Sequence, residues 1–144
     1  MQKNKELIII RIKEFGNNHF ICEGQQLKKL LSIVTYFTKE CYWYIGDIEI
    51  NGYKEEYLQN QDFGDINYEM IEKRSTQKCN IDDLLLLCSQ VYQFIWGTFL
   101  AVPKHIPLVS ENITLWSDRE STLHIQNAIL EIRVFDACYF EILT

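Results

Sequence analysis

The chain has 144 residues, of which 47% are hydrophobic and 24% charged, and its formal net charge is −6. This length and apolar content suit one domain with a buried core over residues 1–144, and the low Pro and Gly content argues against disorder. The acidic balance disfavours nucleic acid and anionic membrane as partners, because both would be repelled. A basic protein partner is compatible with it.

The first elements follow from hydrophobic periodicity. Residues 7–15 alternate, with Ile8, Ile10 and Ile12 on one face, which predicts a strand that ends at Gly16. A helix is predicted over residues 24–37, because five apolar side chains recur at helical spacing: Leu27, Leu30, Leu31, Val34 and Phe37. The apolar run of residues 7–10 is too short for a signal sequence or a bilayer span, so we expect a cytoplasmic protein.

The middle of the chain begins extended and then loses its periodicity. Residues 41–50 read as a strand, and Asn51 and Gly52 form a strong turn signal for a hairpin in which Tyr53 begins the return. From Glu55 to Lys78 we expect mainly an irregular excursion, with a short strand or helical turn around residues 66–71. Loops of this length are uncommon in compact domains and are more often functional than decorative.

A second helix is predicted over residues 81–90, because Asn80 is a good N-cap and two acids, Asp82 and Asp83, occupy the first turn. Residues 91–102 are apolar on both faces, which predicts a central strand, with a bulge at Gly97. The stretch 115–125 is ambiguous between turn and strand.

The end of the chain predicts an antiparallel hairpin. Its inward side chains are Leu130, Ile132, Val134, Cys138, Phe140 and Ile142, and we expect a solvated outer face with Glu131, Arg133, Tyr139 and Glu141. Taken together, the elements predict an α+β fold, a largely antiparallel sheet with two helices packed on it.

The sequence contains no catalytic or cofactor-binding motif. The five cysteines form no CxxC pair, and several lie in apolar runs, so we expect reduced, buried thiols. His19 and Cys22 are three residues apart, but two further ligands are missing, so no metal or other cofactor is predicted. His105 and His124 have no partner at a catalytic spacing.

Charge is concentrated between residues 47 and 72. This stretch holds eight acids and the single base Lys54, for a net charge of −7, while the rest of the chain is near neutral. Aromatic residues are interleaved with the acids or precede them: Tyr42, Trp43, Tyr44, Tyr53, Tyr57 and Tyr68. Acids steer a basic partner and aromatics supply contact area, which favours a protein-binding surface; the alternative is a solvated acidic loop.

Two runs, Tyr42-Trp43-Tyr44-Ile45-Gly46 and the closing residues 130–142, together with the order of elements, resemble small bacterial immunity proteins encoded beside polymorphic or contact-dependent growth inhibition toxins. The chain also resembles a family of uncharacterised small proteins from bacilli. The resemblance implies a cytosolic, non-enzymatic protein that binds one cognate toxin domain, often a nuclease, and blocks its active site. These families share no functional residues that transfer to this chain.

From the charge asymmetry we expect an immunity protein that neutralises a basic toxin, an RNase above all. The expected partner-binding residues are Asp47, Glu49, Tyr53, Glu55, Glu56, Tyr57, Asp62 and Asp65. Two alternatives stay open: an enzyme or small-ligand binder with a pocket near Trp116, His105 and His124, and a housekeeping protein-interaction module.

Overall fold

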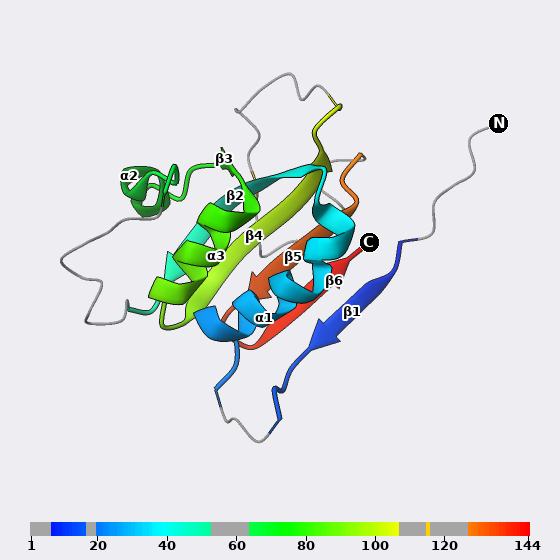
Figure 1. Cartoon of the computed structure of the whole chain (residues 1–144). Helices are drawn as coiled ribbons and strands as arrows, with labels where there is room; N and C mark the ends of the chain where they lie inside the picture. The colour runs from blue at the N-terminus through cyan, green and yellow to red at the C-terminus, as the bar shows by residue number, and fades with distance from the viewer. Residues whose placement is uncertain (1–6, 17–19, 53–63, 107–114, 116–126) are drawn as a thin grey trace.

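A computed structural model describes residues 7–16, 20–52, 64–106, 115 and 127–144, and it shows one sheet with helices on one side (Figure 1). The elements in chain order are β1 (Ile9–Ile12), α1 (Gly24–Val34), the 3₁₀ helix η1 (Thr35–Thr38), β2 (Cys41–Ile50), α2 (Tyr68–Glu72), β3 (Gln77–Cys79), α3 (Ile81–Gln90), β4 (Phe94–Pro103), β5 (Leu130–Phe135) and β6 (Tyr139–Leu143). The predicted α+β class is confirmed.

The six strands form an antiparallel sheet in the order β1-β6-β5-β4-β2-β3. The β2–β4 pair is the longest and runs from Cys41↔Pro103 to Ile50↔Phe94. The terminal hairpin is confirmed in its predicted alternation, since Val134 lies opposite Phe140 and Ile132 opposite Ile142. The sheet therefore combines a local hairpin with pairings between strands far apart in the chain.

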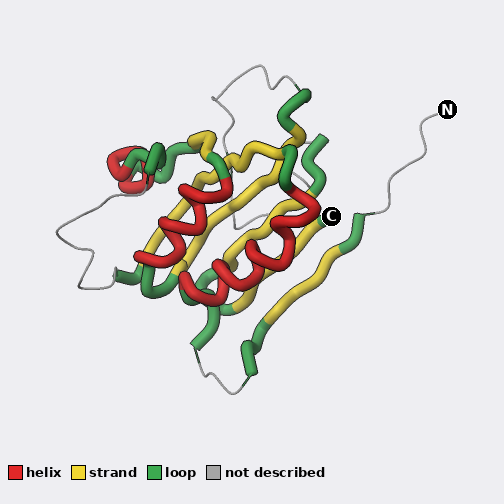
Figure 2. Tube along the Cα trace, in the orientation of Figure 1, coloured by secondary structure: helices red, strands yellow, loops and turns green. Residues whose placement is uncertain are grey.

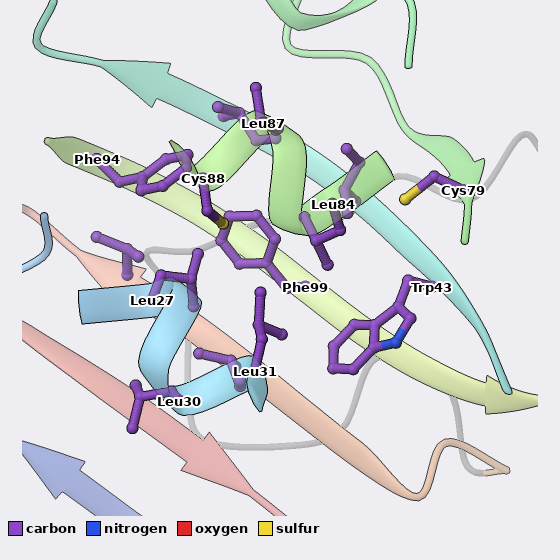
Figure 3. Close-up of a cluster of buried hydrophobic side chains, with 14 of the residues drawn as sticks. Leu27, Leu30, Leu31, Trp43, Cys79, Leu84, Leu87, Cys88, Phe94 and Phe99 are labelled. Atoms are coloured by element: carbon purple, nitrogen blue, oxygen red, sulfur yellow. The ribbon is translucent and has the colours of Figure 1, made fainter. Parts of the chain in front are cut away.

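Helices α1 and α3 lie side by side on one face of the sheet (Figure 2). Between them and the strands lies the main core, where Leu27, Leu31, Trp43, Leu87 and Phe99 are fully buried (Figure 3). Each such side chain contributes about 1.5–3 kcal/mol by leaving water. Burial of this apolar set holds the helices on the sheet.

The helix predictions are largely confirmed, with one error at the end of the first helix. The Asn80 side chain caps α3 by accepting from the Asp83 N–H. In contrast, Phe37 is 73% exposed rather than part of the buried stripe. The chain tightens to a 3₁₀ helix at Thr35, and three residues per turn rotate Phe37 off the apolar face.

The outer face of the terminal hairpin is not solvated, which corrects the sequence prediction. Glu131, Arg133 and Glu141 are 0%, 1% and 5% exposed. A second apolar cluster occupies the same side of the sheet and consists of Tyr44, Leu100, Val102, Leu115 and Ala128. Alternation along a strand cannot reveal this, because it shows which residues share a face but not what covers it.

The buried charges are paired. Arg133 donates from Nε and Nη2 to the two carboxylate oxygens of Glu131 at 3.2 and 3.1 Å. Glu141 lies opposite Arg133 in the β5–β6 register and accepts from Arg11 Nε at 2.9 Å. Arg11 of β1, Glu141 of β6 and Arg133 of β5 thus lie side by side on three neighbouring strands, with alternating charge. Buried charge is tolerated only when it is paired in this way.

Four other expectations are corrected. The bulge lies in β2 rather than at Gly97, because residues 46–49 of β2 face residues 98–96 of β4. The expected irregular excursion contains helix α2, as expected for residues 66–71, and also strand β3, which was not expected and forms by pairing with β2. Cys138 is exposed in the hairpin turn, and β1 is shorter than the predicted 7–15. The return strand expected from Tyr53 lies outside the described residues, as does nearly all of the ambiguous stretch 115–125.

At Gly24 the start of α1 lies close to the backbone at the end of α3. A Cβ on Gly24 would lie 2.2 Å from the carbonyl oxygen of Val91 and 2.3 Å from that of Cys88. We therefore expect Gly24→Ala to lower the free energy of unfolding by about 1–3 kcal/mol, since backbone atoms must move. Urea unfolding measures the loss. Gln25→Ala, at the exposed next position, is the control, and equal stability of the two variants would contradict the close approach.

The buried pair of Glu131 and Arg133 gives a second prediction. Glu131→Leu leaves the guanidinium of Arg133 without its carboxylate, and we expect a loss of about 3–5 kcal/mol in unfolding free energy. The double variant Glu131→Leu/Arg133→Met removes both charges and should be more stable than the single variant. Denaturant unfolding of both variants and of Arg133→Met completes the cycle. Additive losses would show that the two charges do not interact.

Candidate functional site

The structure describes three of the eight residues expected to bind a partner. Asp47 and Glu49 lie at the far end of β2, and Asp65 lies just before α2. Tyr53, Glu55, Glu56, Tyr57 and Asp62 fall outside the described residues. The site is therefore built from the described segments on either side of that stretch, which meet at the edge of the sheet beside β3.

A bulge in β2 sets the direction of the two acids. Asp47 has a φ of +51°, and the β2–β4 register shifts between Gly46 and Glu49. Short polar residues such as Asp tolerate this left-handed conformation better than most others. A backbone hydrogen bond joins the bulge to the segment after α2: the Asp47 N–H donates to the carbonyl of Arg74 at 3.3 Å.

Arg74 holds both acids of the bulge. Its Nη2 lies 2.6 Å from Asp47 Oδ1, and its Nη1 lies 3.4 Å from Glu49 Oε2. The Asp47 side chain is mostly buried, whereas Glu49 and Arg74 are both half-exposed. Part of the acidic charge expected for a partner is thus neutralised within the chain. Glu49 is the more accessible of the two carboxylates.

A depression of about 330 Å³ opens between β2 and α2. Ile48, Ile50 and Ile71 supply its apolar part, and Glu49, Glu72 and Arg74 its charged part. Three of the six lining residues are charged, and Ile48 and Ile71 are almost fully buried, so the accessible lining is mostly polar. Glu49 and Glu72 both place carboxylates in this lining.

Helix α2 is fixed although it is only five residues long. The Asn67 side chain accepts from the Glu69 and Met70 N–H groups at 2.9 and 3.4 Å. The side chain of buried Gln77 in β3 makes two hydrogen bonds to the backbone of Asn67. It accepts from the Asn67 N–H at 2.8 Å and donates to the Asn67 carbonyl at 3.1 Å. These bonds hold α2 in place, and Glu72 of α2 lines the same depression as Glu49.

The structure adds one acid, Asp83, that the sequence analysis had placed only in the first turn of a helix. Asp83 of α3 accepts from the Asp65 N–H at 3.2 Å, and a Cβ on Gly64 would lie 2.0 Å from Asp83 Oδ1. Asp83 is therefore part of the same region. We call Asp47, Glu49, Asp65, Glu69, Glu72 and Asp83 the acidic surface. Only three bases, Lys73, Arg74 and Lys78, lie in the same segments.

The aromatic residues of the expected surface differ in their exposure. Trp43 and Tyr44 are buried, one in each apolar cluster, so they cannot contact a partner. Tyr42 is exposed, with Lys78 Nζ 4.4 Å and Lys104 Nζ 5.4 Å from its ring centroid. Tyr68 of α2 is half-buried and its hydroxyl donates to Glu72. Tyr68 is thus the described tyrosine closest to the depression.

The described residues contain no group of three or more potential metal ligands. His19, Trp116 and His124 lie outside them, and His105 is exposed in the turn after β4. Burial raises the pKa of Cys22 and of Cys79 to about 12, and it raises the pKa of Cys41 and Cys88 as well. These four thiols are protonated at neutral pH and are poor nucleophiles.

Comparison with known proteins yields no match to a family model, a curated protein or a solved structure. None of the helices in the described ranges is long and apolar enough to cross a bilayer.

The cysteines give a direct test of the core. At pH 8 we expect a disulfide reagent such as Ellman's to modify Cys138 quickly, because it is the exposed thiol, and the four buried thiols only upon unfolding. Released thiolate, followed by absorbance, should reach one equivalent in buffer and five in urea. Cys138→Ser is the control and should remove the fast phase. A fast phase that persists in this variant would contradict the burial of the other thiols.

Proposed function

We propose that this protein is a non-enzymatic immunity protein that binds and neutralises a basic toxin domain, with an RNase as the favoured target. The observation that supports the proposal is the acidic surface around the β2–α2 depression. Its six acids come from two separate stretches of the chain, around the bulge and over residues 65–83. The proposed setting is the bacterial cytoplasm, where a toxin of this kind would act.

The chemistry of an RNase matches such a surface. Its active site must attract phosphate and therefore presents Lys, Arg or His side chains. Carboxylates held on a rigid edge imitate phosphate, and a field of this sign raises association rates by about 10–1000-fold at low salt. Glu49 and Glu72 line the depression from two elements, and a cationic side chain between them would contact both.

The anchoring of the surface is as important as its charge. The Asn67–Gln77 bonds and the contacts of Arg74 hold α2 and the bulge in place before a partner arrives. Preorganised groups lose less conformational entropy on binding. The acids around the depression are thus suited to a direct contact rather than only to long-range steering.

Charge reversal tests the proposal. The partner to test is the C-terminal domain of a large secreted protein encoded immediately upstream of this gene, and its association with the chain is measured by stopped flow and calorimetry. We expect Glu49→Lys/Glu72→Lys to slow association by about tenfold or more at low salt and to abolish protection of growth on co-expression. High salt should reduce the difference in association rate between the variant and wild type.

The matched control is Glu14→Lys/Glu40→Lys, which changes the net charge by the same amount at exposed positions outside the acidic surface. This pair should retain tight binding and protection. If both double variants lose binding and protection equally, net charge alone explains the effect. That result would overturn the assignment of partner binding to the acidic surface. A wild-type chain that does not bind the neighbouring toxin would overturn the immunity function itself.

A further inference from the structure

Strand β1 lies at the edge of the sheet opposite the acidic surface and exposes an unusual amount of apolar side chain (Figure 1). Leu7, Ile8, Ile9 and Ile10 are 37%, 56%, 41% and 49% exposed. Among the described residues, β6 is the only strand that pairs with β1. β1 is itself short and carries Arg11, two features that protect a sheet edge. The four consecutive exposed apolar residues 7–10 nevertheless leave this edge apolar, as is typical of a surface that meets a partner.

The alternation of hydrogen bonds between β1 and β6 shows which backbone groups of β1 face away from the sheet. Ile8 exchanges two bonds with Thr144, at 2.8 and 3.0 Å, and the bonds of an antiparallel pair recur at every second residue. Ile10 and Ile12 therefore bond to β6. The N–H and C=O groups of Ile9 and Arg11 point away from the sheet, in the geometry that accepts another strand.

The sequence of β1 is compatible with itself in antiparallel pairing. When Ile10 lies opposite Ile10 of another copy, Ile8 faces Ile12 and Ile9 faces Arg11, so no two like charges are opposed. Arg11 also keeps its 2.9 Å bond to Glu141 of its own chain, which offsets its charge. Isoleucine pairs across strands are favourable, by about 0.2–1 kcal/mol each.

The distribution of charge favours a second copy at this edge. Each chain carries a net charge of −6, and copies meeting through the acidic surface would repel. At β1 the charged neighbours are Arg11, Lys13, Glu14 and Glu141, which balance. The strand order places β2, β3 and the acidic surface at the other edge, so two joined sheets leave both acidic surfaces free.

We propose that β1 pairs antiparallel with β1 of a second copy of this chain, about a twofold axis at Ile10, and that the two six-stranded sheets become one continuous sheet. The pairing is independent of the proposed immunity function. A strand pair of this length buries less than the about 1,000 Å² of a stable interface, so the dimer is weak and forms with rising concentration.

Disulfide trapping tests the pairing. In a Cys138→Ser background, Ile10→Cys places two sulfurs at a non-hydrogen-bonded pair, where Cβ atoms lie about 4.5–5.5 Å apart. We expect this variant to form a covalent dimer under mild oxidation at least about tenfold faster than exposed Ile33→Cys on α1, because pairing raises the effective concentration. Non-reducing electrophoresis measures the rates. Ile8→Cys, which faces Ile12 rather than itself, should also be slow.

Sedimentation equilibrium gives a second readout without new thiols. The wild-type chain of 17.1 kDa should shift toward twice that mass as concentration rises. Ile10→Lys should abolish the shift, whereas Ile33→Lys, an equally drastic change on an exposed apolar residue of α1, should leave it intact. Equal cross-linking at positions 8, 10 and 33, or a wild-type chain that stays monomeric at every concentration, would overturn the proposal.

Discussion

The β2–β4 pair is the constraint on which the rest of the structure depends. It runs for about ten residues through the middle of the sheet, and its two faces support two different layers. Trp43 and Phe99 face the helices, while Tyr44 and Leu100 face the second apolar cluster. Because these strands are covered on both sides, every other element either packs on this pair or extends the sheet from it.

The same pair also creates the candidate site. A strand in a regular ladder would continue straight, but the extra residue in β2 turns its end, and Asp47 takes a left-handed conformation there. Arg74 then closes the bulge with backbone and side-chain contacts. The departure from regular pairing is thus what brings the end of β2 together with α2. It opens the depression between them.

The opposite face of the sheet contains the costliest interactions in the fold. A fully buried Arg133 requires compensation for lost hydration, and Glu131 provides it with two parallel bonds. Buried ion pairs of this kind often contribute no more stability than apolar side chains of similar size. Paired charges instead restrict which strand registers are tolerated, because a slip of one residue would move Arg133 into the main core.

The two edges of the sheet differ in character, and this difference organises the proposed interactions. Acids are concentrated at the β2–β3 side, whereas β1 is apolar with balanced charge. The one edge suits a cationic partner and the other suits an identical strand. A protein with both properties can associate with itself and still present its acidic surface.

Local sequence determined much of the architecture. The first helix (predicted over 24–37, observed over 24–34), the helix over 81–90, the terminal hairpin and the α+β class follow from local signals. These signals are periodicity, a capping Asn80 and alternation, and all of them depend on neighbours within a few residues. Charge asymmetry also follows from sequence, because it is a sum over residues. It pointed to Asp47, Glu49 and Asp65, of which the structure exposes Glu49 and Asp65 and mostly buries Asp47.

Only the tertiary structure decided the rest, since it depends on contacts between distant segments. Strand β3 exists because β2 is available to pair with it, and the bulge belongs to β2 because of its register with β4. Burial of Glu131, Arg133 and Glu141 depends on what lies over their face, which no alternation pattern encodes. Asp83 joins the acidic surface because the chain folds back on the start of α3. Periodicity assigns a side chain to a face, and long-range packing determines whether that face meets solvent, core or a partner.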